Sequence, residues 1–483
     1  MVGITSYGAY IPRYRLSRMA IYMNIGWFNP VTMAVAQGEK AVANYDQDSV
    51  TMAVEAGIDC IKGADAASID KLLVASTTMP YKERQNSAIV AAALNLKSDI
   101  SSVDVTVGVK AGTTALLEAV DSVKGGSAEN ALVTSADCRL GKMGSMQEMF
   151  FGDGAAALLV GADNVAVEVK DSFSLTYDFA DHYRDEDMKF DRTWEERWIR
   201  DEGYSKFIPE AVNGLLNKTG LTIGDFAKVI YPCHFGRVHK SIGKKLGVAP
   251  ERLQPNMYET VGDAGAAHPL LMLVAALEEA NPGDKLLLVS FGSGADAICL
   301  EVTDAIKGIK DKKGVKGNLE QKTELPSYQK YCVFKDIVPV EMGIRGELEP
   351  ASAFTSLWRG RKAVLGLVGS KCKDCGTPVF PPQRICPNPD CQAVDNFEDY
   401  DFSDKPGKIF TYTGDMLAFS FDPPAVYGIV DYEGGGRQWM DFTDCSLDSI
   451  KVGMPVKMSF RRKYVDKVRG VHGYFWKAVP VAG

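Results

Sequence analysis

The strongest constraint on the fold is an internal repeat. Residues 113–137 read as a helix, a glycine-rich turn and an apolar strand, and residues 268–296 repeat that order. Upstream, residues 49–78 and 206–234 form a second pair with the same order of helix and strand. Regular alternation of helices and strands is typical of a layered α/β domain, and a repeat implies two similar supersecondary units.

The repeat divides the first part of the chain into two predicted α/β halves, residues 1–165 and 166–345. In open α/β sheets, ligands bind beyond the carboxyl ends of the strands. We therefore expect a functional site where the strand ends of the two halves meet.

The pattern changes in the last third of the chain. Residues 346–398 combine a helical linker with a cluster of four cysteines. Residues 399–483 read as short strands separated by turns, and this predicts an all-β module, most simply a small barrel of the OB type.

The clustered cysteines have the spacing of a metal site. Cys372 and Cys375 are separated by two residues, ten residues follow, and Cys386 and Cys391 are separated by four. Four thiolates at this spacing favour a closed, tetrahedral zinc site with a structural role, and iron in a rubredoxin-like site is the alternative.

Composition excludes several classes of protein. A net charge of −8 argues against nucleic acid as the main ligand. The sequence has no apolar run of about 18 residues that would span a membrane, and its start lacks the apolar region of a signal peptide. The six cysteines outside the cluster are scattered, as is usual for reduced thiols, so we expect a cytoplasmic protein.

The segment DVTVGVKAGTTAL, residues 104–116, reads as a strand, a turn and the start of a helix. Helix N-termini favour a thiolate and a nearby oxyanion, so chemistry through an acyl-thioester would place a cysteine just before Lys110. That residue is Val109, which has no nucleophilic atom.

These motifs resemble the archaeal and bacterial type of the 3-hydroxy-3-methylglutaryl-CoA synthase family, within the thiolase superfamily. The resemblance rests on these segments across residues 1–345: YGAYIPRYRL (7–16), ASTTMPY (75–81), VKAGTTAL (109–116), GDGAAALLVG (152–161), the strand ending in His234, and PGDKLLLVSFGSGAD (282–296). Residues 350–480 resemble an acyl-CoA-associated domain that joins a rubredoxin-like zinc ribbon to an OB fold.

The resemblance implies a five-layered thiolase fold, a homodimer and a coenzyme A thioester as substrate. Domains like the C-terminal one usually accompany thiolase-like proteins as separate subunits, so a thiolase partner is a further expectation. No nucleic-acid or membrane partner is expected.

The family's site residues carry over only in part. Val109 stands at the position of the nucleophilic cysteine, and Thr77 stands at that of the general-base glutamate. His234 matches the family's histidine, and Gly262-Asp263 stands where the family has a Gly-Asn pair.

Further candidates lie close to these motifs. His268 follows Asp263 at the start of a helix, and Gly292 and Gly294 could bring backbone N–H groups to a substrate oxygen. We expect Asp263 or His268 to act as the base, His234 and the Gly292 N–H to stabilise an enolate, and Thr77, Val109 and Gly294 to contact the substrate.

Three functions are consistent with these residues. The first is a lyase or aldolase that cleaves or forms a carbon–carbon bond in a 3-hydroxyacyl-CoA without a catalytic cysteine. The second is a non-catalytic acyl-CoA-binding scaffold for a thiolase partner. The third is a hydroxymethylglutaryl-CoA synthase-like or Claisen-type acyltransferase whose nucleophile is another residue or has been replaced.

Overall fold

The structure is a computed structural model that describes residues 1–106, 108–185, 187–347 and 352–481. Its contacts divide the chain into two compact units. Unit 1 comprises Met1–Ala43, Asp48–Ala88 and Leu96–Lys335. Unit 2 comprises Asn44–Gln47, Ile89–Asn95 and Asp336–Gly483.

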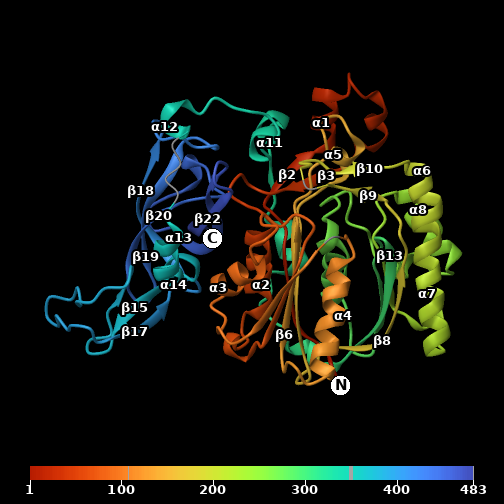
Figure 1. The fold of residues 1–483 in the computed structure, drawn as a ribbon, viewed down its shortest axis with the longest axis horizontal. Helices are drawn as coiled ribbons and strands as arrows, with labels where there is room; N and C mark the ends of the chain where they lie inside the picture. The colour runs from red at the N-terminus through yellow and green to blue at the C-terminus, as the bar shows by residue number, and fades with distance from the viewer. Residues whose placement is uncertain (107, 186, 348–351, 482–483) are drawn as a thin grey trace. The chain divides into compact units, whose positions relative to one another are not determined.

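A nine-stranded mixed sheet forms the frame of unit 1 (Figure 1). Its strands in spatial order are β11 (Lys228–Ile230), β12 (Lys285–Val289), β13 (Gly294–Val302), β8 (Val167–Thr176), β1 (Gly3–Tyr10), β7 (Gly154–Gly161), β6 (Ala131–Asp137), β4 (Lys71–Ala75) and β5 (Ser101–Val105). The two parts of the sheet are joined where β1 pairs with β8 over two residue pairs.

The two parts repeat one topology. From the junction outward, the first half runs β1-β7-β6-β4-β5 and the second runs β8-β13-β12-β11. In both halves the two pairings nearest the junction are antiparallel, and the pairings further out are parallel. The predicted repeat is therefore present in the structure.

Helices cover both parts of the sheet in five layers (Figure 1). The outer layers are α2 (Ser49–Ile61) on the first half and α7 (Ser205–Thr219) with α8 (Gly236–Lys245) on the second. The central layer contains α4 (Ala111–Lys124) and α9 (His268–Leu277), which pack against each other between the two parts of the sheet. Alanine, leucine and valine fill this layer, because its helices are covered on both faces.

The connection from β8 to α7 consists of short elements. It contains β9 (His182–Tyr183), β10 (Arg192–Thr193), α6 (Glu196–Trp198) and a π-helical turn, η3 (Ile199–Tyr204). We call residues 177–204 the β8–α7 connection.

Smaller elements complete unit 1. A three-stranded sheet joins β14 (Thr323–Glu324), β2 (Tyr14–Ser17) and β3 (Glu39–Val42). The remaining helices are α1 (Arg18–Ile25), α5 (Met146–Phe150), α10 (Gly314–Glu320) and α11 (Tyr328–Phe334), with short turns η1 (Pro30–Val35), η2 (Ala66–Ser68), η4 (Ile223–Asp225), η5 (Pro250–Arg252), η6 (Gly265–Ala267) and η7 (Asp304–Gly308). The helix α3 (Asn86–Ala93) begins in unit 1 and ends in unit 2.

Unit 2 contains the predicted ribbon and barrel. A small sheet joins β16 (Pro378–Val379), β15 (Val368–Cys372) and β17 (Phe397–Asp401). A five-stranded antiparallel sheet follows, in the order β20 (Arg437–Asp441), β19 (Ala425–Tyr432), β18 (Gly407–Asp415), β21 (Pro455–Asp466) and β22 (Val471–Pro480). A bridge between Phe442 and Ala478 connects the two edges of this sheet, so the sheet closes into a barrel. The helices of unit 2 are α12 (Gly343–Glu347), α13 (Phe354–Arg359) and α14 (Arg361–Leu365), and η8 (Leu447–Ser449) is a short helical turn.

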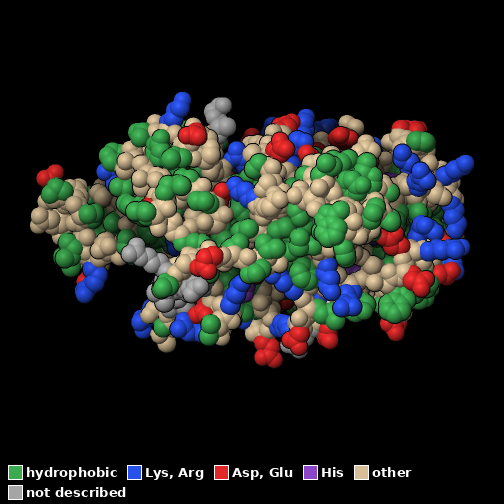
Figure 2. Space-filling view, turned by 90° about the horizontal axis from the view of Figure 1, so that it is seen from above, with side chains coloured by type: hydrophobic (Ala, Val, Ile, Leu, Met, Phe, Trp, Pro, Cys, Tyr) green, Lys and Arg blue, Asp and Glu red, His purple; other side chains and the backbone are tan. Residues whose placement is uncertain are grey.

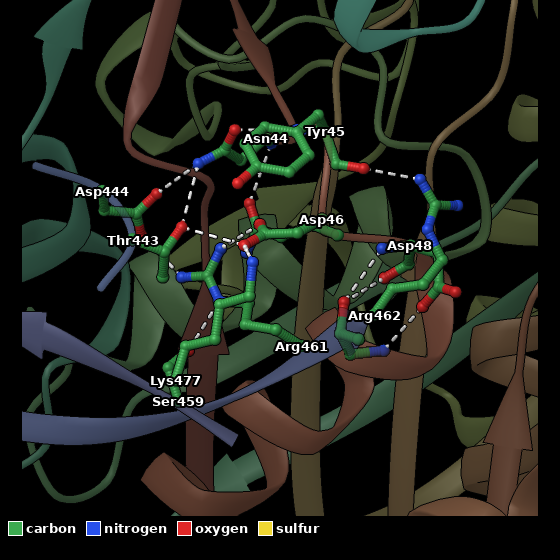
Figure 3. Close-up of polar contacts among 12 residues, drawn as sticks. Asn44, Tyr45, Asp46, Asp48, Thr443, Asp444, Ser459, Arg461, Arg462 and Lys477 are labelled. Carbon is green, nitrogen blue, oxygen red and sulfur yellow. Dashed lines mark hydrogen bonds and ion pairs between the residues drawn. The ribbon is translucent and has the colours of Figure 1, made fainter. Parts of the chain in front are cut away.

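A buried charge network lies inside unit 2 (Figure 3). The Asp46 carboxylate accepts from Lys477 Nζ at 2.8 Å and from Arg461 Nη1 at 3.1 Å. Thr443 Oγ1 also donates to Asp46, at 2.9 Å, and Arg461 Nη2 reaches Asp444 at 2.5 Å. Asp46 and Arg461 are each 1% exposed, so these charges depend on one another rather than on water.

A group of exposed apolar side chains lies in and after α1. Met23, Trp27, Phe28 and Val31, in and after α1, are each at least 66% exposed. Figure 2 shows hydrophobic side chains gathered on the face that carries this part of unit 1, with acidic and basic side chains interspersed elsewhere. Within the described ranges, no helix combines the length and apolarity that crossing a bilayer requires.

Candidate functional site

A pocket in unit 1 lies where the segments after β5, β6, β11 and β12 come together. Residues of the β8–α7 connection form part of its wall, and aromatic rings form much of the rest. The lining residues are Val109, Arg139, Met146, Gln147, Phe150, Phe151, Asp181, His182, Thr193, Glu196, Ile199, Tyr204, Pro232, His234, Phe235, Tyr258, Asp263, Gly265, Pro269 and Phe291.

Val109 lies in this pocket, one residue before Lys110, the N-cap of α4. Residue 109 therefore lies at a helix N-terminus, as predicted. The side chain of Val109 is a hydrocarbon. The backbone of Gly292 approaches it so closely that a Cβ atom at Gly292 would lie 2.7 Å from Val109 Cγ2. Only glycine fits beside Val109 in this conformation, which has φ of 151° at Gly292.

Thr77 is directed to a buried carboxylate and does not line the pocket. Its backbone N–H and its hydroxyl donate to Asp137, at 2.7 and 2.9 Å. Asp137 also accepts from the hydroxyls of Ser76 and Thr78 and from the N–H of Ala266. Thr77 thus helps to hold Asp137, and it supplies no base to the pocket.

His234 follows β11 and lines the pocket between aromatic rings. Its ring lies 4.9 Å from that of Phe150 and 4.1 Å from that of Phe235, centre to centre. Burial lowers the pKa of His234 to about 4, so the imidazole is neutral at pH 7. The Tyr204 hydroxyl lies 3.4 Å from Nδ1, and burial raises the pKa of Tyr204 well above its usual value. A phenol that keeps its proton donates to Nδ1, which leaves the proton of His234 on Nε2.

Asp263 lines the pocket as one half of an ion pair. Its Oδ1 lies 2.8 Å from Nη2 of Arg139 and accepts from the Gly265 N–H at 2.9 Å. Burial opposes ionisation, but Arg139 outweighs it and holds the pKa of Asp263 well below its usual range. A carboxylate held in this way is a weak proton acceptor.

His268 does not line the pocket, and both of its ring nitrogens have partners within the protein. Nε2 lies 2.8 Å from the Asn256 carbonyl, and Nδ1 accepts from the Ala264 N–H at 3.3 Å. The ring also stacks on Tyr258, at 4.5 Å. These contacts explain His268 as a structural residue at the start of α9.

The glycine loop after β12 supports the pocket through its backbone. The Gly292 N–H, expected to stabilise an enolate, donates instead to the Gly294 carbonyl at 3.0 Å. A Cβ atom at Gly294 would lie 2.0 Å from the Leu175 carbonyl oxygen, so this residue is needed for strand packing. In this structure the Gly292 N–H is therefore not directed to Val109.

Several charged or polar residues of the pocket are absent from the sequence-based prediction, among them Arg139, Asp181, His182, Glu196 and Tyr204. All of these except Arg139 belong to the β8–α7 connection, where hydrophobic periodicity predicts no elements. The adjacent Asp181-His182 pair after a strand end is the one signal in the sequence that could have identified this region.

The four clustered cysteines come together in unit 2. Their sulfur atoms all lie within 4.8 Å of one another, with Cys372 to Cys391 at 3.8 Å and Cys375 to Cys386 at 3.5 Å. Tetrahedral zinc with Zn–S bonds of about 2.3 Å requires sulfur atoms roughly 3.8 Å apart. The donor set therefore fits zinc, and all four positions are cysteines, as expected for a structural site.

Three parts of the chain match known protein families. Residues 216–302 match the C-terminal domain of 3-oxoacyl-[acyl-carrier-protein] synthase III. Residues 361–398 match the ChsH2 rubredoxin-like zinc ribbon domain, and residues 401–461 match the ChsH2 C-terminal OB-fold domain. The chain thus fuses a thiolase-type domain to a zinc ribbon and an OB fold.

Solved structures share the fold of unit 1. A crystal structure described as HMG-CoA synthase complexed with CoA superposes with a TM-score of 0.63 at 18% identity, over 73% of this chain and 94% of that one. The 3-oxoacyl-[acyl-carrier-protein] synthase III of Aquifex aeolicus VF5 gives 0.55 at 19% identity, over 62% and 100% of the two chains. These similarities establish a thiolase-type fold.

Two sequence relatives are more similar to this chain in sequence than the solved structures above. The hydroxymethylglutaryl-CoA synthase of Methanopyrus kandleri is 32% identical over 317 residues, which are 64% of this chain and 90% of the relative. That of Caldivirga maquilingensis is 31% identical over 352 residues, 71% of this chain and 99% of the relative. Since nearly the whole length of these synthases is matched at this identity, the chain belongs to the hydroxymethylglutaryl-CoA synthase family.

Proposed function

We propose that the protein is an acyl-CoA carbon–carbon lyase or aldolase that works without an acyl-cysteine intermediate. The observation that carries the proposal is Val109, which stands in the pocket at the helix N-terminus where the family resemblance calls for a cysteine. A synthase of this type needs a thiolate to accept the acetyl group. Aldol chemistry on a thioester needs no covalent bond to the enzyme.

The proposed reaction balances without a redox partner. A base removes the proton of the 3-hydroxyl, the C2–C3 bond breaks, and C3 leaves as an aldehyde or ketone. The electron pair moves to the thioester as an enolate, which takes a proton at C2 to give a shorter acyl-CoA. The reverse sequence forms the 3-hydroxyacyl-CoA.

His234 supports the enolate in this proposal. A neutral imidazole with its proton on Nε2 donates a hydrogen bond without protonating the enolate, and Tyr204 favours this tautomer. The surrounding rings keep water away, so one donor counts for more than it would in solvent.

The substrate is proposed to be a coenzyme A thioester, by similarity to the synthases. The zinc ribbon is proposed to hold a structural zinc ion. We also propose that the chain forms a homodimer, because β5 lies at an end of the nine-stranded sheet and its Val103 is 39% exposed. A thiolase partner remains part of the proposal.

The test is a pair of measurements on the intact protein. The protein is incubated with a panel of 3-hydroxyacyl-CoA thioesters, from 3-hydroxybutyryl-CoA to 3-hydroxy-3-methylglutaryl-CoA, and the shorter acyl-CoA and carbonyl products are quantified. Its mass is then recorded after exposure to acetyl-CoA. Cleavage of a thioester without an acetyl adduct is the expected result.

Two other outcomes would replace the proposal. An acetyl adduct would indicate a Claisen-type synthase or acyltransferase that uses another nucleophile. Binding of every thioester with no turnover in either direction would indicate an acyl-CoA-binding scaffold.

A further inference from the structure

The proposed reaction needs a base, and the residues at the family positions do not provide one. Thr77 is bound to Asp137 outside the pocket lining. Asp263 is paired with Arg139, and His268 has partners at both ring nitrogens. The base must therefore come from another part of the pocket wall.

His182 has the geometry that a base requires. It lies on β9 and lines the pocket, and its Nδ1 is 2.9 Å from Oδ2 of Asp181. Within the part of the chain that the structure describes, its Nε2 has no hydrogen-bond partner. A carboxylate on Nδ1 fixes the tautomer in which the unprotonated Nε2 can accept a proton.

The short hairpin of β9 and β10 holds this pair in place. His182 is opposite Thr193 in the hairpin, and the Thr193 hydroxyl donates to the Asp181 carbonyl at 2.9 Å. The hairpin is attached to the first half of unit 1, because the Asp191 N–H donates to the Leu140 carbonyl at 2.9 Å. The dyad is thus fixed to the loop that follows β6.

The charges around His182 favour its protonated form. Burial alone would lower the pKa of His182, but Asp181 and, more weakly, Asp191 outweigh burial, so the pKa is raised above its usual value. Arg139 opposes this shift, and the neighbouring His234 is neutral. Asp181 itself has a lowered pKa, despite its burial, because it faces His182.

We propose that His182 is the catalytic base at the substrate's 3-hydroxyl, and that Asp181 is the residue that positions it. This inference rests on the proposed function. In cleavage, Nε2 takes the hydroxyl proton as the C2–C3 bond breaks, and in the reverse direction the imidazolium returns that proton to the new alkoxide. His234 remains the donor at the thioester oxygen, so the two histidines act at opposite ends of the breaking bond.

The experiment compares His182→Gln and Asp181→Asn with the wild-type chain on whichever 3-hydroxyacyl-CoA it cleaves. Loss of a general base typically costs 100- to 10,000-fold, so kcat of His182→Gln should fall by about that factor while KM changes little. Tyr183→Phe is the matched control: Tyr183 is the next residue on β9, is 40% exposed and does not line the pocket. Its kcat should equal that of the wild type.

The pH profile tests the role of Asp181. Cleavage requires unprotonated His182, so activity should fall as the pH drops through the raised pKa of His182. Asp181→Asn removes the carboxylate that raises this pKa, and the acidic limb should then move to lower pH. With five histidines in the chain, NMR titration can follow the His182 ring directly and should show the same shift.

The outcomes separate the two proposals. If the wild type cleaves a thioester but His182→Gln keeps near-full kcat, or Asp181→Asn leaves the acidic limb in place, the base is another residue and the lyase function stands. If the wild type cleaves no thioester in the panel, the function and the base both fall.

Discussion

At the scale of single residues, the pocket combines a hydrocarbon side chain at a helix N-terminus with buried charges. The residue at the helix N-terminus is Val109, and Arg139, Asp181 and His182 line the same pocket. Arg139 and Asp263 neutralise each other at 2.8 Å, so they can lie in an aromatic pocket at a moderate cost in free energy. These residues are the basis of the proposed proton-transfer mechanism.

Restoring cysteine at position 109 should create the capacity to bind an acyl group. The N-terminus of α4 would stabilise a thiolate there, so Val109→Cys should gain the mass of one acetyl group from acetyl-CoA. Intact-protein mass spectrometry checks this, with Val109→Ser and the wild type as controls. An adduct of equal yield on the wild-type chain would mean that the nucleophile lies elsewhere.

Removing the ring of His234 should weaken stabilisation of the enolate. One such donor is typically worth about 2.7–4 kcal/mol, so His234→Ala should lose roughly 100- to 1000-fold in kcat. Steady-state kinetics on the cleaved thioester measures the loss. His239→Gln is the control, because His239 is buried on α8 outside the pocket lining. Near-full activity of His234→Ala would remove this residue from the mechanism.

At the scale of secondary-structure elements, the zinc ribbon depends on two cysteine pairs. The turn after Cys372 closes through the Gly376 N–H, which donates to the Cys372 carbonyl at 2.9 Å, and Gly376 has φ of 74°. The strands β15, β16 and β17 have 5, 2 and 5 residues, so a bound zinc ion would supply much of their stability.

Cys375→Ser should therefore lose the metal and unfold the ribbon. Elemental analysis should find about one zinc per wild-type chain and much less in the variant, and hydrogen exchange should lose protection over β15 to β17. The matched control is Cys445→Ser, a cysteine outside the cluster. Stoichiometric iron in place of zinc, or full metal content in Cys375→Ser, would contradict the assignment.

The edge strand β5 supports the proposed dimer. A charge on an exposed edge blocks pairing with a second chain, so Val103→Lys should shift the protein from dimer to monomer. Light scattering after size-exclusion chromatography measures this. Val468→Lys introduces the same charge at a fully exposed turn and should change nothing. A monomeric wild type would reject the dimer.

The sequence could predict those elements that have a periodic pattern or a characteristic residue spacing. The two halves and their helices follow from a repeat of long amphipathic and apolar segments, which periodicity detects well. The cysteine spacing likewise identifies the ribbon. The dyad of Asp181 and His182 was missed because β9 has two residues, too few for a periodic pattern. The direction of the Gly292 N–H is a matter of local backbone geometry, which residue identity does not determine.

At the scale of the whole molecule, the sequence alone could not predict contacts between residues that lie far apart along the chain. Asp46 pairs with Arg461 and Lys477, which are 415 and 431 residues away. No local pattern links these positions, and a lone aspartate in a polar segment reads as a loop residue.

Asp46→Asn should destabilise unit 2, because it removes the carboxylate that pairs with buried Lys477 and leaves Arg461 with one carboxylate partner, Asp444, in place of two. Breaking a buried pair in this way costs about 3–5 kcal/mol. Denaturant unfolding of the full chain should show the loss, whereas Asp431→Asn, which breaks the exposed pair with Arg437, should leave the unfolding midpoint unchanged. Equal stability of Asp46→Asn and the wild type would show that the network contributes nothing.

Asp46 should also make the free energy of unfolding depend on pH. Burial opposes ionisation, but Lys477 and Arg461 lower the pKa of Asp46 to about 2, from an unfolded value of about 3.9. The ionised form therefore adds stability above about pH 4, and this contribution is lost as the pH falls toward 2. The Asp46→Asn variant should lack this acid-dependent step.

Unit 2 includes two short segments, Asn44–Gln47 and Ile89–Asn95, that lie far along the sequence from Asp336, where the main part of that unit begins. A gene fragment that begins at residue 336 would encode Lys477 without the carboxylate of Asp46, and Arg461 with only Asp444 as its carboxylate partner. We therefore expect residues 336–483, expressed alone, to be less stable than the same residues in the full chain.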